Sequence, residues 1–174
     1  MERGFFMVIY TRKTNRLKDY DYSRSGYYFV TICTDDRVHQ FGNIVDGQIR
    51  LNQWGKMAQK CWQGIPDHFP SVELDEYVVM PNHIHGIIIV GAGFPRPDTK
   101  GAETAPLRPT LGQIVAYFKY QSTKHINIIR GSQGRRVWQR NYWEHVIRNE
   151  NDLNRTREYI RNNPVSWDID ENNI

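Results

Sequence analysis

The sequence predicts an α+β fold of the ferredoxin-like class, a split βαβ sandwich in which helices cover one face of an antiparallel sheet. Three observations support this: runs of β-branched and aromatic residues, apolar residues at helical spacing between those runs, and the order of the elements along the chain. That order is strand, helix, strand, strand, helix, strand, helix. The first six elements match the split βαβ unit, and the seventh is an extra C-terminal helix.

The predicted strands are short runs bounded by turn residues. They cover residues 26–34, 72–80, 83–91 and, as a strand or strand pair, 137–148. Asp46-Gly47 lies between two short apolar runs in residues 39–52, which indicates a hairpin.

The predicted helices cover residues 51–69, 110–131 and 149–164. Pro66 ends the first helix, Thr110 caps the second, Asn149 caps the third, and Pro164 ends it. The second helix carries a buried stripe, predicted to consist of Leu111, Ile114, Val115, Phe118, Ser122 and Ile126.

The chain of 174 residues fits a single domain, 1–174, with residues 1–25 as an N-terminal arm and the Pro- and Gly-rich residues 92–110 as a flexible loop. The net charge of +4 and the aromatic content of 13% suit a polyanionic partner, single-stranded nucleic acid in particular. No apolar run reaches about 18 residues, so no membrane partner is expected. Cys33 and Cys61 lack paired spacing, and the expected location is the cytoplasm.

Two of the six histidines, His83 and His85, lie one residue apart in the apolar run Met80-Pro81-Asn82-His83-Ile84-His85-Gly86. Side chains alternate across a strand, so both imidazoles point to one face and Ile84 points to the other. Their Cβ atoms should lie about 7 Å apart, within reach of one metal ion. A pair of partly exposed histidines on a solvated strand is the alternative, although the apolar flanks favour burial, and buried imidazoles need partners.

The C-terminal helix offers further candidates for the same site. Tyr159 and Asn163 are four residues apart and therefore share a helix face, while Leu153 and Ile160 form the stripe that packs on the sheet. The Asn163 amide oxygen is a hard metal ligand, and a tyrosine beside a metal-bound phosphate is a candidate nucleophile. An aromatic at a helix edge and a helix C-cap remain the plainer interpretations of these two residues.

Together these motifs resemble a known family. "YVVMPNHIHGIII" followed by "VWQRNYWEHVIRNENDLNRTREYIRNNPVSW" is similar to the REP-associated tyrosine transposases and, more broadly, to the single-tyrosine HUH transposases. The similarity covers roughly residues 24–168. HxH alone is weakly specific, whereas "MPNHIH", "WxRxYWEHxIR" and "YIxNNP" in this order are strongly specific.

The resemblance implies an enzyme that nicks and rejoins single-stranded DNA at hairpin-containing sites through a 5′-phosphotyrosine link. His83 and His85 match the HUH pair that binds Mg²⁺ or Mn²⁺, Asn163 matches a third ligand, and Tyr159 matches the nucleophile. Tyr120, in the second helix, is a rival nucleophile. The implied protein is a monomer or a homodimer and acts in the cytoplasm of a bacterial-type cell, associated with the nucleoid.

The second half of the chain carries candidate DNA contacts. Glu144 and His145 point to opposite faces of their strand. One of them is expected to support the metal site by a hydrogen bond to a metal ligand, without binding the metal ion itself. Basic side chains suit phosphates and tryptophans suit unpaired bases. The predicted contacts are Lys119, Lys124, Arg136, Arg140, Arg157, Arg161, Trp138 and Trp143.

Two other functions are compatible with parts of the pattern. A nucleotide hydrolase of the histidine-triad type would need a third alternating histidine where the chain has Ile87. A non-catalytic single-stranded nucleic-acid-binding module on a ferredoxin-like sheet would display aromatic residues on the sheet face rather than paired histidines.

Overall fold

A four-stranded antiparallel sheet forms the centre of the computed structural model, which describes residue 17, residues 20–92 and residues 108–173. The strand order is β4-β5-β1-β6. The bounds are β1 (Gly26–Cys33), β4 (Val72–Val79), β5 (His83–Val90) and β6 (Trp143–Ile147). Numbered by their order along the chain, the sheet strands run 2-3-1-4, which confirms the ferredoxin-like split βαβ topology. Most of the predicted N-terminal arm and flexible loop lies outside the described residues.

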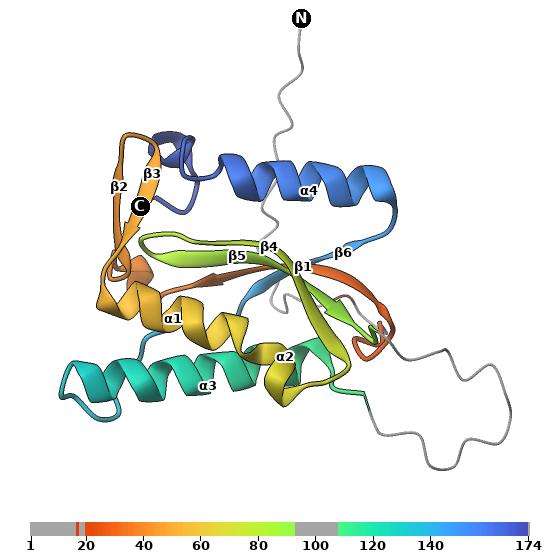
Figure 1. The fold of residues 1–174 in the computed structure, drawn as a ribbon, viewed down its shortest axis with the longest axis horizontal. Coiled ribbons are helices and arrows are strands. Elements are labelled where there is room, and N and C mark those ends of the chain that lie inside the picture. Colours follow the sequence, from red (N-terminus) through yellow and green to blue (C-terminus); the bar gives the residue numbers. More distant parts are fainter. Residues whose placement is uncertain (1–16, 18–19, 93–107, 174) are drawn as a thin grey trace, which may run out of the picture.

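Helices cover both faces of this sheet (Figure 1). The helices α1 (Gln53–Gln63), α2 (Ile65–His68) and α3 (Leu111–Ile129) lie on one face, as predicted for the sandwich. The extra helix α4 (Glu150–Asn162) lies on the opposite face. In the described part of the chain, no helix is long and apolar enough to cross a membrane.

The main core fills the space between the sheet and helices α1 and α3. All six residues of the predicted α3 stripe are buried. The Thr110 hydroxyl accepts from the backbone of Gln113, and the Gln113 side chain accepts from the backbone of Thr110. This reciprocal cap satisfies backbone donors that the helix itself leaves unpaired, and it fixes where α3 begins.

A smaller apolar cluster holds α4 on the other face. Leu153 and Ile160 of α4 are buried against Phe29, Ile87 and Ile147 of the sheet. Asn149 caps the helix, since its side chain accepts from the backbone of Asp152. The packing role predicted for Leu153 and Ile160 is therefore confirmed.

The predicted hairpin and first helix are present with small changes. β2 (Gly42–Val45) pairs with β3 (Gln48–Leu51) around Asp46 and Gly47, both at positive φ. Pro66 does not end α1 directly; the chain leaves the helix at Gly64 and restarts as α2, with Pro66 in its first turn. A proline there needs no N–H partner, which is why the break precedes it.

The segment 137–142 is not strand, which corrects the predicted span of 137–148. Trp138 makes one isolated bridge to Thr34, and β6 begins at Trp143. The Lys119 ammonium donates to the backbone oxygens of Gln139, Arg140 and Asn141. Successive carbonyls of a strand point in opposite directions, so three consecutive carbonyls that converge on one ammonium are incompatible with a strand.

Candidate active site

His83 and His85 lie on the face of β5 that α4 covers. Their ring centroids are 4.3 Å apart. Both side chains are buried, with 0% and 1% exposure, and Ile84 points into the core on the opposite face. The predicted shared face is confirmed, and this burial argues against the alternative of a partly exposed pair.

Hydrogen bonds behind the two rings orient them. The Asn82 Oδ1 atom accepts from His83 Nδ1 at 2.8 Å, which leaves the lone pair on His83 Nε2 facing the site. His85 Nδ1 lies 2.9 Å from the Thr31 hydroxyl. A histidine that binds a metal ion commonly has such a partner on its other nitrogen.

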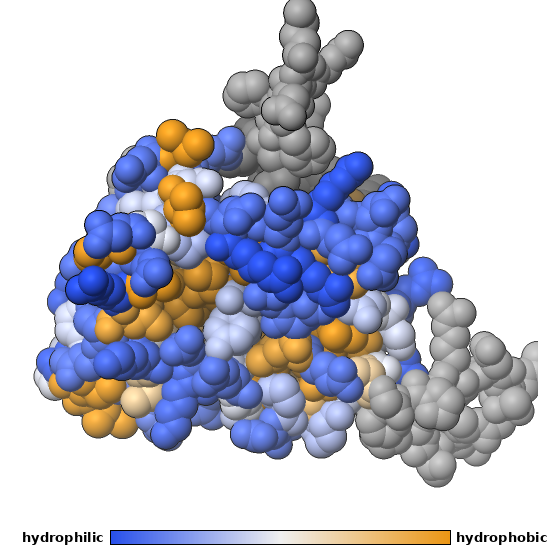
Figure 2. Space-filling model, turned by 45° about the horizontal axis from the view of Figure 1, so that its top comes forward, coloured by the Kyte–Doolittle hydropathy of each residue, from blue (hydrophilic) through white to orange (hydrophobic). Residues whose placement is uncertain are grey.

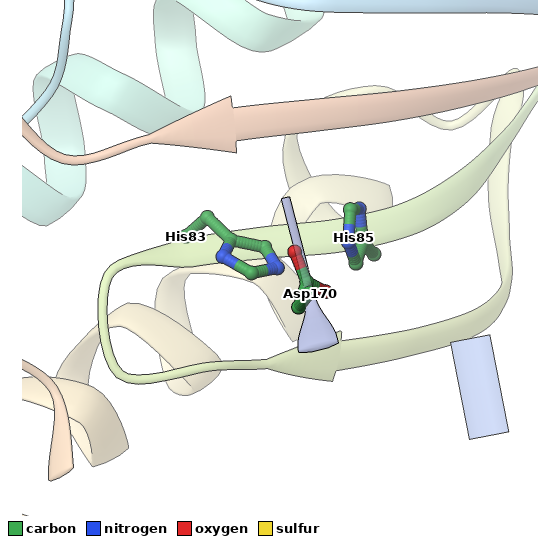
Figure 3. Close-up of side chains that lie close together, drawn as sticks. All are labelled: His83, His85 and Asp170. Carbon is green, nitrogen blue, oxygen red and sulfur yellow. The ribbon is translucent and has the colours of Figure 1, made fainter. Parts of the chain in front are cut away.

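A carboxylate from the C-terminal segment completes the cluster. Ligand atoms of His83, His85 and Asp170 all lie within 4.8 Å of one another, and Figure 3 shows the three side chains converging. Asp170 follows η2 (Trp167–Ile169), whose Trp167 is buried with its ring 6.0 Å from that of His83. The sequence reasoning missed Asp170; a lone tryptophan in the polar tail was the available signal that this segment packs on the protein.

Asn163 reaches the same place from the end of α4. Its Nδ2 donates to Asp170 Oδ2 at 2.6 Å. Within the described residues, Asn163 Oδ1 and His83 Nε2 are buried and have no hydrogen-bond partner. Buried polar atoms rarely stay unpaired, and a nitrogen lone pair and an amide oxygen both suit a cation. These orphaned atoms and the nearby carboxylate therefore fit a divalent metal ion.

The phenol of Tyr159 lies beside the histidines. Its hydroxyl oxygen is 3.3 Å from His85 Nε2, and its ring packs edge-on against Phe29 with 5.9 Å between centroids. Tyr159 retains 41% exposure, so a substrate can reach it. Tyr120 is also exposed, at 64%, but it lies on α3, across the sheet from the histidines.

Burial sets the protonation of these groups. It lowers the pKa of His83 to about 3, with a smaller contribution from the positive charge of Arg37. Burial and the neighbouring His83 also lower the pKa of His85, while burial and the charges of Asp170 and Glu171 raise the pKa of Tyr159. At neutral pH both imidazoles are thus neutral and able to bind a cation, and the phenol keeps its proton unless a positive charge is near.

Glu144 and His145 take other roles. Glu144 accepts a hydrogen bond from the Tyr22 hydroxyl at 2.7 Å, and His145 pairs with Asp152 at 2.9 Å. Asn82 and Thr31 contact the imidazoles in their place. The predicted support of the metal site by Glu144 or His145 is therefore corrected.

The predicted DNA contacts differ in how accessible their side chains are. Lys124, Arg136 and Arg140 are exposed, and Trp143 is half-buried beside Phe29. Trp138 is 5% exposed and donates to Ser122, so the core holds the ring that was predicted to stack on bases. The remaining predicted contacts have partners within the chain, as found for Lys119, Arg157 and Arg161.

Comparison with known proteins agrees with the motifs and the fold. An uncharacterised protein of Haemophilus influenzae is 39% identical, over 94% of this chain and 93% of its own length. A second protein of that organism, assigned as a REP-associated tyrosine transposase, is 28% identical over 83% of this chain and 73% of its own length.

The fold has a counterpart among solved structures. A REP-associated tyrosine transposase bound to a REP hairpin superposes with a TM-score of 0.59 at 23% identity, covering 87% of this chain and 73% of that one. No protein-family model matches the chain. The chain is thus similar to the REP-associated tyrosine transposases in its sequence motifs and in its fold.

Proposed function

We propose that the protein is a metal-dependent single-stranded DNA endonuclease and strand transferase that nicks and rejoins DNA at hairpin-containing sites through a 5′-phosphotyrosine intermediate. The observation that carries the proposal is the placement of the Tyr159 hydroxyl 3.3 Å from His85 Nε2, at the edge of the His83, His85 and Asp170 cluster. A nucleophile and the groups that can hold a metal ion thus meet within one chain.

The metal ion would be held by His83, His85 and Asp170, with Asn163 Oδ1 able to supply a further oxygen. One carboxylate and one amide oxygen suit Mg²⁺ or Mn²⁺, and the imidazoles make Mn²⁺ the better match of the two. When bound, the ion supplies positive charge that polarises and orients a phosphate oxygen.

Tyr159 is the proposed nucleophile. Its oxygen loses a proton and forms a bond to phosphorus, while the bond from phosphorus to the 3′ oxygen breaks. The 3′ oxygen takes up a proton, so the products are a 5′-phosphotyrosine and a free 3′-OH. The phosphotyrosine link conserves the energy of the broken bond. A 3′-OH can attack the same phosphorus in the reverse sense, release Tyr159 and join two strands.

Hairpin-bearing DNA is the proposed substrate. A REP hairpin is bound by the structurally similar transposase, and the exposed Lys124, Arg136 and Arg140 are available for phosphate contacts here. Because Tyr159 lies beside the histidines of its own chain, a monomer is sufficient for the nicking step.

A non-catalytic nucleic-acid-binding module is less well supported. Such modules stack bases on the open face of a ferredoxin-like sheet. Here α1 and α3 cover one face of the sheet and α4 covers the other, so bases have no open sheet face on which to stack.

The test is covalent capture on a denaturing gel. The full chain is incubated with a single-stranded oligonucleotide that carries a hairpin and the DNA flanking the protein's gene, with Mn²⁺, with Mg²⁺ or with EDTA. We expect a protein–DNA adduct only with a metal ion, its loss in Tyr159→Phe, and its retention in the control Tyr120→Phe. An adduct in Tyr159→Phe, or one insensitive to EDTA, contradicts the proposal.

A further inference from the structure

The edge strand β4 contains an irregularity beneath α4. Its pairing with β5 shifts register between Leu74 and Tyr77. These two residues both pack on the core beneath α1 and α3, although an odd spacing of three residues should place them on opposite faces of a regular strand. The two residues between them, Asp75 and Glu76, therefore form a β-bulge, a device that redirects side chains.

Both bulge carboxylates bind arginines of α4. Asp75 accepts two hydrogen bonds from Arg157, at 3.0 and 2.6 Å, in a bidentate ion pair. Glu76 accepts from Arg161 at 2.7 Å. In a regular strand only one of two successive side chains would face α4, so the bulge is what allows both ion pairs.

These arginines and the tyrosine lie on opposite flanks of the helix. Successive residues are rotated by about 100° around a helix axis, so Arg161 and Tyr159 lie on opposite sides of the buried Ile160. Arg157 shares the flank of Arg161, since the two are four residues apart. One flank is thus tied to β4, while the other directs Tyr159 over His85 of β5 and Phe29 of β1.

We propose that Asp75 and Glu76 act as positioning residues for the nucleophile: through Arg157 and Arg161 they set the rotation of α4 about its axis, and hence the distance from Tyr159 to His85. The inference builds on the proposed function, because a set distance matters for a reacting phenol. The apolar contacts of Leu153 and Ile160 hold α4 on the sheet but resist rotation weakly, since such contacts are non-directional. A bidentate ion pair is directional.

Under this proposal, the two arginines that the sequence predicted to contact DNA position α4 instead. Arg157 is 29% exposed and Asp75 13%, so this pair is the better shielded of the two; the Arg161–Glu76 pair is more exposed, at 61% and 30%. We therefore expect the Arg157–Asp75 pair to contribute most of the effect. The outer surface over α4 is hydrophilic (Figure 2), and Arg155 on the same helix is an exposed arginine that serves as a matched control.

The experiment separates positioning from DNA contact. Hairpin oligonucleotide affinity and the single-turnover rate of adduct formation at saturating DNA are measured for Arg157→Gln, Asp75→Asn, the charge swap Asp75→Arg with Arg157→Asp, and Arg155→Gln. We expect both single variants to slow adduct formation about tenfold or more with affinity changed less than about twofold, because small misplacements of a reacting group are costly. The charge swap should recover part of the rate, and Arg155→Gln should match the wild type.

A second measurement does not depend on cleavage of DNA. In protein labelled with 3-fluorotyrosine, the ¹⁹F signal of Tyr159, assigned with Tyr159→Phe, should shift in Arg157→Gln and return toward its original position in the charge swap. An unshifted signal together with an unchanged rate of adduct formation overturns the inference. Weaker DNA binding at an unchanged saturated rate also overturns it, because Arg157 would then be a DNA contact. Absence of any wild-type adduct would instead refute the proposed function, and the ¹⁹F signal alone would then decide on positioning.

Discussion

At the residue scale, the rings of His83 and His85 are already held in an orientation that suits a cation. Burial keeps both rings neutral, and Asn82 and Thr31 hold their outer nitrogens. This arrangement costs little reorganisation when a metal ion binds, because the inward-facing lone pairs already point at the site.

Asp170 carries the first prediction. Asp170→Asn removes the negative charge from the cluster, and we expect Mn²⁺ affinity to fall about tenfold to a hundredfold, as measured by isothermal titration calorimetry. Asp168→Asn, in an exposed aspartate of the same segment, should bind Mn²⁺ like the wild type. Equal losses in the two variants would show that overall charge, and not ligation, accounts for the effect.

The sequence was sufficient to predict that the histidines and the tyrosine lie together, because the histidines follow strand alternation and the tyrosine lies in a motif of the family that the sequence resembles. Strand alternation puts His83 and His85 on one face, and the "YIxNNP" motif indicates Tyr159. Asp170 has no such pattern: it lies in a polar segment, and only the packing of Trp167 brings it to the histidines. Asn82 was within the motif, but its role depends on the turn that aims its side chain.

At the element scale, α4 combines a short apolar stripe with charged flanks. The stripe explains why the helix packs on the sheet, yet helical periodicity does not say which face of the sheet it covers. The predicted bounds of α3 and α4 were close because caps and prolines act locally. The predicted strand across 137–142 was wrong because Lys119, distant in sequence, binds the carbonyls of that segment.

The α4 ion pair carries a pH prediction. Hydrogen bonds from Arg157 lower the pKa of Asp75 below its usual 3.8, so the unfolded chain binds more protons than the folded one as the pH falls through that range. The stability that the pair contributes is therefore complete above about pH 5 and is lost in acid. We expect Asp75→Asn to lower the free energy of unfolding by about 1 kcal/mol at neutral pH, for a partly exposed pair, and by progressively less as the pH falls below 3.8.

Urea unfolding across this pH range checks the prediction. The control is Glu73→Gln, in an exposed acid of the same strand. A difference between wild type and Asp75→Asn that persists unchanged at low pH would mean that the ion pair is not its source.

At the scale of the whole molecule, the two faces of the sheet have different roles. The face beneath α1 and α3 holds the larger core, and the face beneath α4 holds the site (Figure 1). Gly86 lies on β5 directly after His85, and the Trp62 ring of α1 packs against its backbone. Packing on one face thus supports the strand that presents the histidines on the other.

Gly86 allows this connection to be tested. A Cβ atom at Gly86 would overlap the fully buried Trp62 ring, so Gly86→Ala should lower the free energy of unfolding by about 2 kcal/mol in urea. Gly26, a strand glycine in β1 with no atom nearer than 3.9 Å to the added Cβ, should tolerate alanine with a change below about 0.5 kcal/mol. Similar losses at both positions would indicate that backbone flexibility, rather than contact with Trp62, is the cause.

The chemical identity of the DNA linkage tests the central claim most directly. The adduct formed with Mn²⁺ is digested with nuclease and trypsin, and the peptide that retains a nucleotide is identified by mass spectrometry. Trypsin cleaves after Arg157 and Arg161, so we expect the nucleotide phosphate on the peptide Glu158–Arg161, at Tyr159. A nucleotide on the peptide that contains Tyr120, or on any residue other than Tyr159, would contradict the account.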